Sequence, residues 1–134
     1  MQGPLIIALG GRVVGLNKDT GTQIWRNEMQ GGGLSWVALA VSETRVFCSA
    51  SASKIFCIDR FTGETLWSSK TSGLGRATIL YEDNKVFVCK SGHTDCFNVQ
   101  SGALIWSEDL RSLGKMGAAI GLTDNVVQAD GKSN

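Results

Sequence analysis

The chain has 134 residues, of which 43% are hydrophobic and 19% are charged, and its formal net charge is +1. This length suits one domain, and the apolar fraction is large enough to form a core. The near-neutral charge argues against a nucleic-acid-binding protein, and no apolar run reaches the roughly 18 residues of a membrane span. We therefore predict one domain over residues 1–134 that binds neither nucleic acid nor a membrane.

Two features of the sequence indicate a compartment. The first apolar stretch, Leu5–Leu9, is too short for a signal peptide and lacks a basic segment before it, so we read it as a strand. The four cysteines lie within apolar, strand-like runs and contain no CxxC pair: Cys48, Cys57, Cys89 and Cys96. We therefore expect buried, reduced thiols, no metal site and a cytoplasmic protein.

Three segments of the chain repeat one pattern, at 16–25, 58–67 and 97–106. Each has an apolar residue, then Asn or Asp, then Thr or Ser directly before Gly, and Trp four residues after that Gly. The tryptophans, at positions 25, 67 and 106, are 42 and 39 residues apart. A repeat of this length signals an architecture built from stacked units.

Each unit is predicted to hold four short strands, A to D. The first unit offers strands B to D over about 5–29, the second unit spans about 36–70, and the third spans about 76–109. Within the second and third units we expect strands at about 37–42, 45–50, 54–59, 64–69, 77–82, 85–90, 93–98 and 103–108. A further strand A follows at about 117–123, and then a second B-like piece at 125–130. Four strands with a period near 40 favour a β-propeller over a sandwich or a barrel.

The turn between strands C and D explains the repeated residues. Glycine there provides the positive φ that reverses the chain, at Gly21, Gly63 and Gly102. The Asn or Asp of each repeat can accept hydrogen bonds from backbone N–H groups two residues later, at Asn17, Asp59 and Asn98. We expect the tryptophans of strand D to pack between neighbouring blades, at Trp25, Trp67 and Trp106.

This Asn/Asp-x-x-Thr/Ser-Gly-x-x-x-Trp unit resembles the tryptophan-docking repeat of quinoprotein-like (PQQ-like) β-propellers, and it covers nearly the whole chain. The resemblance implies an all-β propeller of four-stranded antiparallel blades, three of them in this chain. Two functional classes share the repeat: quinone-dependent alcohol dehydrogenases, and non-catalytic propellers such as outer-membrane assembly lipoproteins.

Three blades do not close a ring, because known rings hold about four to eight blades. We expect a homodimer with six blades, in which the strand at 117–123 of one chain completes blade 5–29 of the other. The alternative is that the chain is a fragment of a longer propeller, although the start at Met1 favours the homodimer.

An enzyme would need a site that the sequence does not offer. By resemblance, a quinone dehydrogenase needs a calcium cluster, an Asp base and a Trp under the quinone, and many carry a vicinal disulfide. This chain has no adjacent cysteines, one histidine (His93), and no phosphate-binding loop. We therefore expect no catalytic residue, metal or cofactor, and a quinone-dehydrogenase relative is the least favoured alternative.

Binding has better support, because the D–A and B–C loops emerge at one end of a propeller. Each strand C begins with a basic residue or histidine, and the D–A loops end in Trp36 or Arg76. Cations beside an aromatic ring suit anionic or sugar ligands, so we predict ligand contacts at Trp36, Arg76, Arg12, Lys54 and His93. The favoured function is lectin-like carbohydrate binding, and the alternatives are a protein–protein interaction scaffold or ordinary solvated loops.

Overall fold

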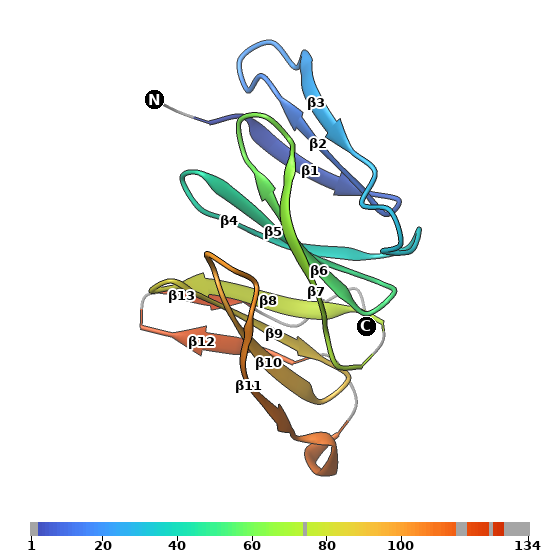
Figure 1. Ribbon diagram of the computed structural model, residues 1–134, viewed down its shortest axis with the longest axis vertical. Coiled ribbons are helices and arrows are strands. Elements are labelled where there is room, and N and C mark those ends of the chain that lie inside the picture. The colour runs from blue at the N-terminus through green and yellow to red at the C-terminus, as the bar shows by residue number, and fades with distance from the viewer. Residues whose placement is uncertain (1–2, 74, 115–117, 124, 128–134) are drawn as a thin grey trace.

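The computed structural model describes residues 3–73, 75–114, 118–123 and 125–127, and it is built from antiparallel sheets (Figure 1). The first sheet has three strands, β1 (Leu5–Leu9), β2 (Arg12–Leu16) and β3 (Gln23–Asn27). The second has four, β4 (Val37–Val41), β5 (Arg45–Ala50), β6 (Lys54–Asp59) and β7 (Thr65–Lys70). The third also has four, β8 (Ala77–Glu82), β9 (Lys85–Lys90), β10 (His93–Asn98) and β11 (Leu104–Asp109).

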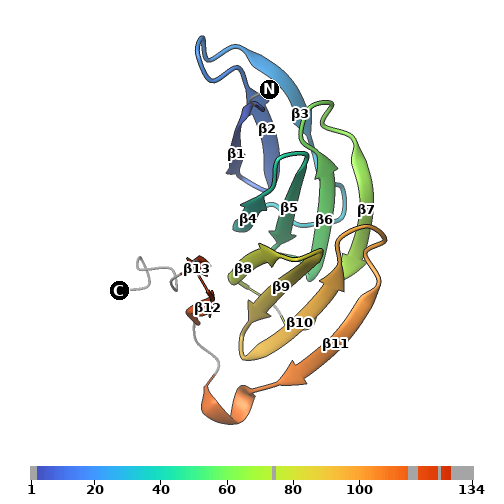
Figure 2. The ribbon, with the colours of Figure 1, turned by 90° about the vertical axis from the view of Figure 1, so that its left-hand side faces the viewer.

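These three sheets are the blades of a propeller, as the sequence predicted. In each blade the strands follow one another in chain order, and each pairs antiparallel with the next. Figure 2 shows the blades stacked face to face, with β1, β4 and β8 along one side and β3, β7 and β11 along the other. We call them blade 1 (β1–β3), blade 2 (β4–β7) and blade 3 (β8–β11).

The turn before the last strand of each blade has one conformation. In blade 2 the Asp59 carboxylate accepts hydrogen bonds from the backbone N–H groups of Phe61 and Thr62, at 2.8 and 2.9 Å. Asn17 and Asn98 do the same two and three residues later in their blades. In each blade the register shifts directly after the residue that faces the tryptophan. Such a bulge increases the local twist and turns the tryptophan side chain toward the next blade.

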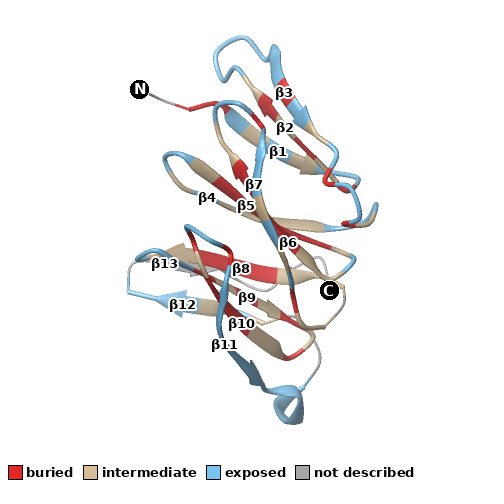
Figure 3. Cartoon of the chain, viewed as in Figure 1, coloured by how far each residue is buried: buried red, intermediate tan, exposed pale blue. Residues whose placement is uncertain are grey.

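Two apolar cores lie between the blades, where Figure 3 shows the buried residues concentrated. The face of blade 1 that carries Val13 and Trp25 packs on Val46, Cys48 and Ile58 of blade 2. The opposite face of blade 2 packs on blade 3 through a second cluster that includes Phe47, Ile55, Val86 and Phe97. Each blade buries its apolar side chains against a neighbour, so blade-to-blade contact holds the fold together.

After blade 3 come a short 3₁₀ turn, η1 (Arg111–Leu113), and a hairpin of β12 (Ile120–Leu122) and β13 (Asn125–Val127). The hairpin lies beside β8 (Figure 2). β12 falls within the strand expected at 117–123, and β13 begins the B-like piece at 125–130, whose last three residues lie outside the described chain. In the described residues β12 pairs with β13, and β1 pairs with β2. Since the structure contains one chain, strand exchange in a six-bladed homodimer stays a prediction.

The four cysteines, all within the described residues, are free thiols. Cys48, Cys57 and Cys96 are buried, and Cys89 is half-buried. Burial raises the pKa of the Cys57 thiol to about 11, so this thiol stays protonated at neutral pH.

Candidate functional site

The contact between blades 1 and 2 centres on Trp25, which is 7% exposed. Its indole Nε1 donates a hydrogen bond of 2.8 Å to the carbonyl oxygen of Arg60. Its ring lies over Gly63, where an added Cβ would come within 2.5 Å of the ring. The Asn27 amide donates hydrogen bonds of 2.9 Å to the Gly63 carbonyl and to the Thr65 hydroxyl. The repeated glycine is therefore the surface on which the tryptophan of the preceding blade docks.

The contact between blades 2 and 3 repeats this geometry. Trp67 Nε1 donates a hydrogen bond of 2.8 Å to the carbonyl oxygen of Val99, one residue after the turn asparagine. Its ring covers Gly102, where a Cβ would overlap it, and the Ser69 hydroxyl donates to the Gly102 carbonyl. Trp67 also packs on the ring of Phe47, with centroids 6.3 Å apart.

The third copy of the motif is undocked. Trp106 is 43% exposed, and it packs on Phe87 with centroids 6.1 Å apart, much as Trp67 packs on Phe47. At the other end of the arc, Gly21 is exposed and has no described atom within 4 Å of where its Cβ would be. The sequence makes the three copies equivalent, whereas the structure leaves one tryptophan and one glycine turn uncovered.

At one end of the molecule, the loops that join consecutive blades (the D–A loops) pack on the turns between strands B and C of each blade (the B–C turns). The Ala52 N–H donates to the Gly32 carbonyl at 2.8 Å, and the Ser53 hydroxyl donates to the Gly73 carbonyl at 2.6 Å. In blade 3, the Leu110 N–H donates to the Gly92 carbonyl at 2.7 Å. These bonds hold both kinds of loop at one rim, which carries all five of the predicted ligand residues.

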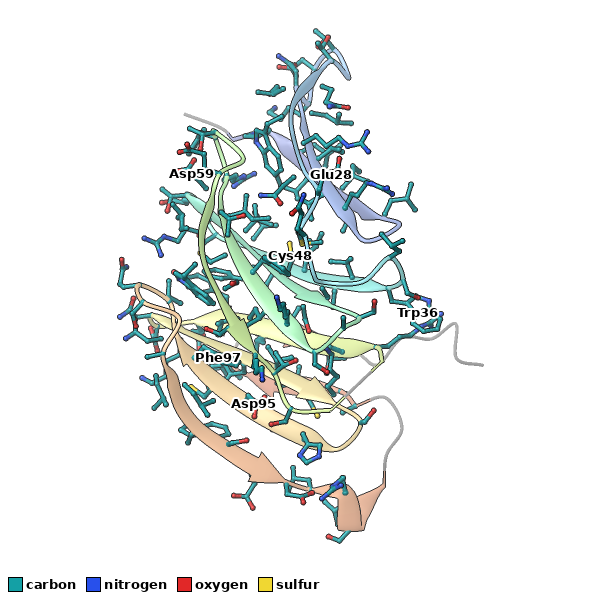
Figure 4. All side chains as sticks on the ribbon, turned by 45° about the vertical axis from the view of Figure 1, so that its right-hand side comes forward. Glu28, Trp36, Cys48, Asp59, Asp95 and Phe97 are labelled. Carbon is teal, nitrogen blue, oxygen red and sulfur yellow. The ribbon has the colours of Figure 1, made fainter. Side chains whose placement is uncertain are left out.

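Trp36 and Arg76 meet at this rim although they belong to different blades. The Arg76 guanidinium carbon lies 4.4 Å from the centroid of the Trp36 ring, a cation–π distance. Trp36 is still 53% exposed and lies at the edge of the molecule in Figure 4. Leu34, in the same loop, is 75% exposed. We call Leu34, Trp36 and Arg76 the rim patch.

The other three predicted ligand residues lie outside the rim patch. The Arg12 guanidinium is paired with Glu28 at 2.7 Å, and Arg26 pairs with the same carboxylate. Hydrogen bonds from Arg12 and Arg26 hold the pKa of Glu28 below its usual range. Lys54 and His93 are half-buried at the starts of β6 and β10. The three repeated cations thus lie one to a blade, each at the start of its strand.

A cavity of about 340 Å³ lies at the opposite end, near the turns of blades 1 and 2. Its lining includes Pro4, Lys18, Ile24 and Phe61. Pro4 stands where the next blade has Arg45, which reaches the Val99 carbonyl at 2.7 Å and the Gln100 side chain at 3.1 Å. Proline has no side-chain donor to reach the turn of blade 2. Arg60 of blade 2 instead donates to the Pro4 carbonyl at 3.1 Å, and the space beside Phe61 is left open. A comparison of Pro4 with Arg45, which hold the same place in the repeat, would have revealed this cavity from the sequence.

A buried lysine links blades 2 and 3, and sequence analysis missed it. Lys90 Nζ donates to the Ala50 carbonyl at 2.7 Å and to the Thr71 hydroxyl at 3.3 Å. Burial lowers the pKa of Lys90 to about 8, and the nearby Asp95 carboxylate opposes that shift. Asp95 in turn accepts hydrogen bonds from the Ser72 backbone N–H and the Ser107 hydroxyl. Lys90 and Asp95 both have hydrogen-bond partners, so we assign this buried network a structural role.

The described residues lack two features that would point to particular functions. They contain no cluster of three His, Cys, Asp or Glu side chains placed to hold a metal ion. None of their helices combines the length and apolar character needed to cross a membrane.

Four-stranded blades joined by tryptophan docking define a β-propeller of the quinoprotein-like class. The chain belongs to the family described as outer membrane protein assembly factor BamB, whose model matches residues 9–132. The outer membrane protein assembly factor BamB of Nitrosomonas eutropha is 28% identical over an alignment of 127 residues, and the match covers 83% of this chain and 31% of that protein.

Solved structures agree on the fold. BamB from Moraxella catarrhalis aligns with a TM-score of 0.65 and 23% identity, over 89% of this chain and 36% of that one. The computationally designed Ika4 protein aligns with a TM-score of 0.76 and 18% identity, over 98% of this chain and 82% of that one. The chain thus spans about a third of the length of the BamB proteins that it matches.

Proposed function

We propose that this chain is a non-enzymatic protein-binding unit, with the rim patch as its contact surface. The observation that carries the proposal is membership of the BamB family over residues 9–132, since the relatives are named as protein assembly factors. The interaction scaffold that the sequence left as an alternative is therefore favoured over a catalytic function.

The rim patch has the composition of a protein interface. Trp and Arg are the residues most enriched at energetically important interface positions, and exposed apolar side chains beside them exclude water on binding. Leu34 and Trp36 are both more than half exposed in one loop, and Arg76 from the next blade holds the indole in place. The partner we propose is an extended protein segment with apolar and acidic side chains.

Carbohydrate binding, the function favoured from sequence alone, has no support from the comparisons. The Arg76 guanidinium covers one face of the Trp36 ring, and a sugar stacks on an open aromatic face. Of the repeated cations that suggested sugar sites, Arg12 is already paired with Glu28.

An array of synthetic peptides with apolar and acidic side chains, probed beside a glycan array with the same labelled chain, tests the proposal. We expect peptide binding that Trp36→Ala and Leu34→Ala each weaken at least about tenfold. Ile24→Ala is the matched control, because Ile24 is equally exposed but lies at the opposite end. Glycan binding without peptide binding, or peptide affinity unchanged by Trp36→Ala, would refute the proposal.

Two further expectations remain proposals. A second copy of the chain is a proposed partner, because among the described residues Trp106 of blade 3 is 43% exposed and the Gly21 turn of blade 1 is open. The free thiols favour the cytoplasm, whereas the relatives' names refer to the outer membrane, so we keep the location as a prediction for fractionation of the source cells.

A further inference from the structure

We propose that blade 3 of one copy docks on blade 1 of a second copy, with Trp106 seated on the Gly21 turn and Lys85 paired with Asp19. This inference goes beyond the rim patch, because it concerns the two outer faces of the arc. It identifies the contacts through which a second copy would associate with the first.

Trp106 already has the geometry of a docking tryptophan. It stands opposite Cys96 in the β10–β11 ladder, as Trp67 stands opposite Cys57 in the β6–β7 ladder. It packs on Phe87 at 6.1 Å, as Trp67 packs on Phe47 at 6.3 Å. The side chain is preorganised, so docking costs little additional side-chain entropy.

The Gly21 turn has the geometry of a docking surface. The Gly21 N–H donates to the Asn17 carbonyl at 2.8 Å, and φ of Gly21 is 79°. The corresponding values in the occupied turn of blade 3 are 2.8 Å and 78°, for Gly102 and Asn98. By register, the carbonyl of Lys18 replaces those of Arg60 and Val99 as the acceptor for an indole N–H.

Charges beside the two surfaces are complementary. Within the chain, Arg45 at the start of β5 reaches across to Gln100 in the turn of the next blade. Lys85 holds the place of Arg45 in blade 3, and Asp19 holds the place of Gln100 in blade 1. Both side chains are exposed: that of Asp19 is 82% exposed and already lies 3.7 Å from the exposed Lys18 ammonium, which leaves room for a second cation. Docking therefore brings a cation and an anion to positions where the inner blades have a hydrogen bond.

The strand face around the Gly21 turn is apolar and uncovered. Leu5, Ile7 and Leu9 of β1 are 49%, 38% and 78% exposed. The residues at the same places in blade 2, Val46, Cys48 and Ala50, are fully buried against blade 1. A second copy fits this face because it carries the matching tryptophan, and two copies docked in both directions would form a closed six-bladed ring. In that ring β1 of the other copy takes the place of β13 beside β12.

The mass of the 134-residue chain in solution, by sedimentation equilibrium across a concentration series, tests the proposal. We expect an assembly of two copies, twice the 14.3 kDa chain mass, whose dissociation constant rises at least about tenfold with Trp106→Ala or Gly21→Ala. Trp67→Ala is the control, because Trp67 docks within the chain: it should lower the unfolding midpoint more than Trp106→Ala does.

A charge exchange makes the test specific. Lys85→Glu and Asp19→Lys should each weaken self-association, because each places like charges together. An equal mixture of the two variants should recover it, because each interface in a mixed pair again joins opposite charges. A chain that stays monomeric at all concentrations, an assembly insensitive to Trp106→Ala and Gly21→Ala, or a mixture that fails to recover would each overturn the proposal. The rim patch is untouched by these variants, so its peptide affinity is judged separately.

Discussion

The docking geometry predicts that one substitution has very different costs at two copies of the same motif. Gly102 and Gly21 occupy equivalent turns, with φ of 78° and 79°. An alanine Cβ at Gly102 would overlap the Trp67 ring, whereas at Gly21 it would meet no described atom within 4 Å. Comparing Gly102→Ala with Gly21→Ala in the monomeric chain therefore separates backbone strain from loss of docking.

Both variants place alanine in the left-handed region, which costs about 1–2 kcal/mol and is partly offset in the unfolded chain. Gly102→Ala must also displace Trp67, which loses its hydrogen bond to Val99, about 1 kcal/mol. Trp67 also loses part of its burial. For comparison, full truncation of a core tryptophan costs about 3–5 kcal/mol. We expect a total loss of about 3–5 kcal/mol for Gly102→Ala and about 1 kcal/mol for Gly21→Ala.

Urea unfolding, followed by tryptophan fluorescence at concentrations where the chain is monomeric, measures the two free energies. Gly63→Ala is a second test of the same kind, because its Cβ would meet Trp25. Equal losses at Gly21 and Gly102 would refute the docking argument, since they would mean that backbone strain alone explains the motif.

Two pH dependences follow from the polar groups. Because burial lowers the pKa of Lys90 from 10.5 to about 8, the folded state binds fewer protons than the unfolded state between those values, and stability attributable to Lys90 rises with pH there. We expect Lys90→Met to abolish this rise in urea titrations compared across that range. The pKa of Asp59 is lowered from 3.8, mainly by the hydrogen bond from the Thr62 backbone N–H. Its contribution to stability is therefore present above pH 3.8 and is lost as the pH falls below that value. Asp59→Asn should remove this acid dependence at little cost near neutral pH, since Asn17 and Asn98 form the same turn. Asp59→Ala should cost about 1 kcal/mol near neutral pH, and less as pH falls below 3.8.

Strands and turns were predictable because they depend on local sequence. The expected strands of blades 2 and 3 differ from the observed ones by at most one residue at either end. The turn residues Asn17, Asp59 and Asn98 make the hydrogen bonds expected of them, since an Asx turn needs only its own neighbours. These features require no knowledge of how the blades are arranged.

Contacts between blades were harder to predict, because they depend on pairs of distant positions. Lys90 looks like an exposed strand residue in sequence, yet it is buried because the Ala50 carbonyl and Thr71 lie beside it. Trp36 and Arg76 hold the same place in two different loops, and only the stacking of the blades brings them to 4.4 Å. The sequence identified both as rim residues but not as partners.

The docking motif is common to every blade, so it cannot by itself specify which blade follows which. Positions where the repeats differ must provide that order. Asn27 bonds to Thr65 as well as to the Gly63 carbonyl, whereas Ser69 at the equivalent place bonds to the Gly102 carbonyl. Arg45 reaches Gln100 where Pro4 leaves a cavity. Because tryptophan docking is shared by the contacts between blades, we infer that these unequal flanking pairs discriminate one register from another.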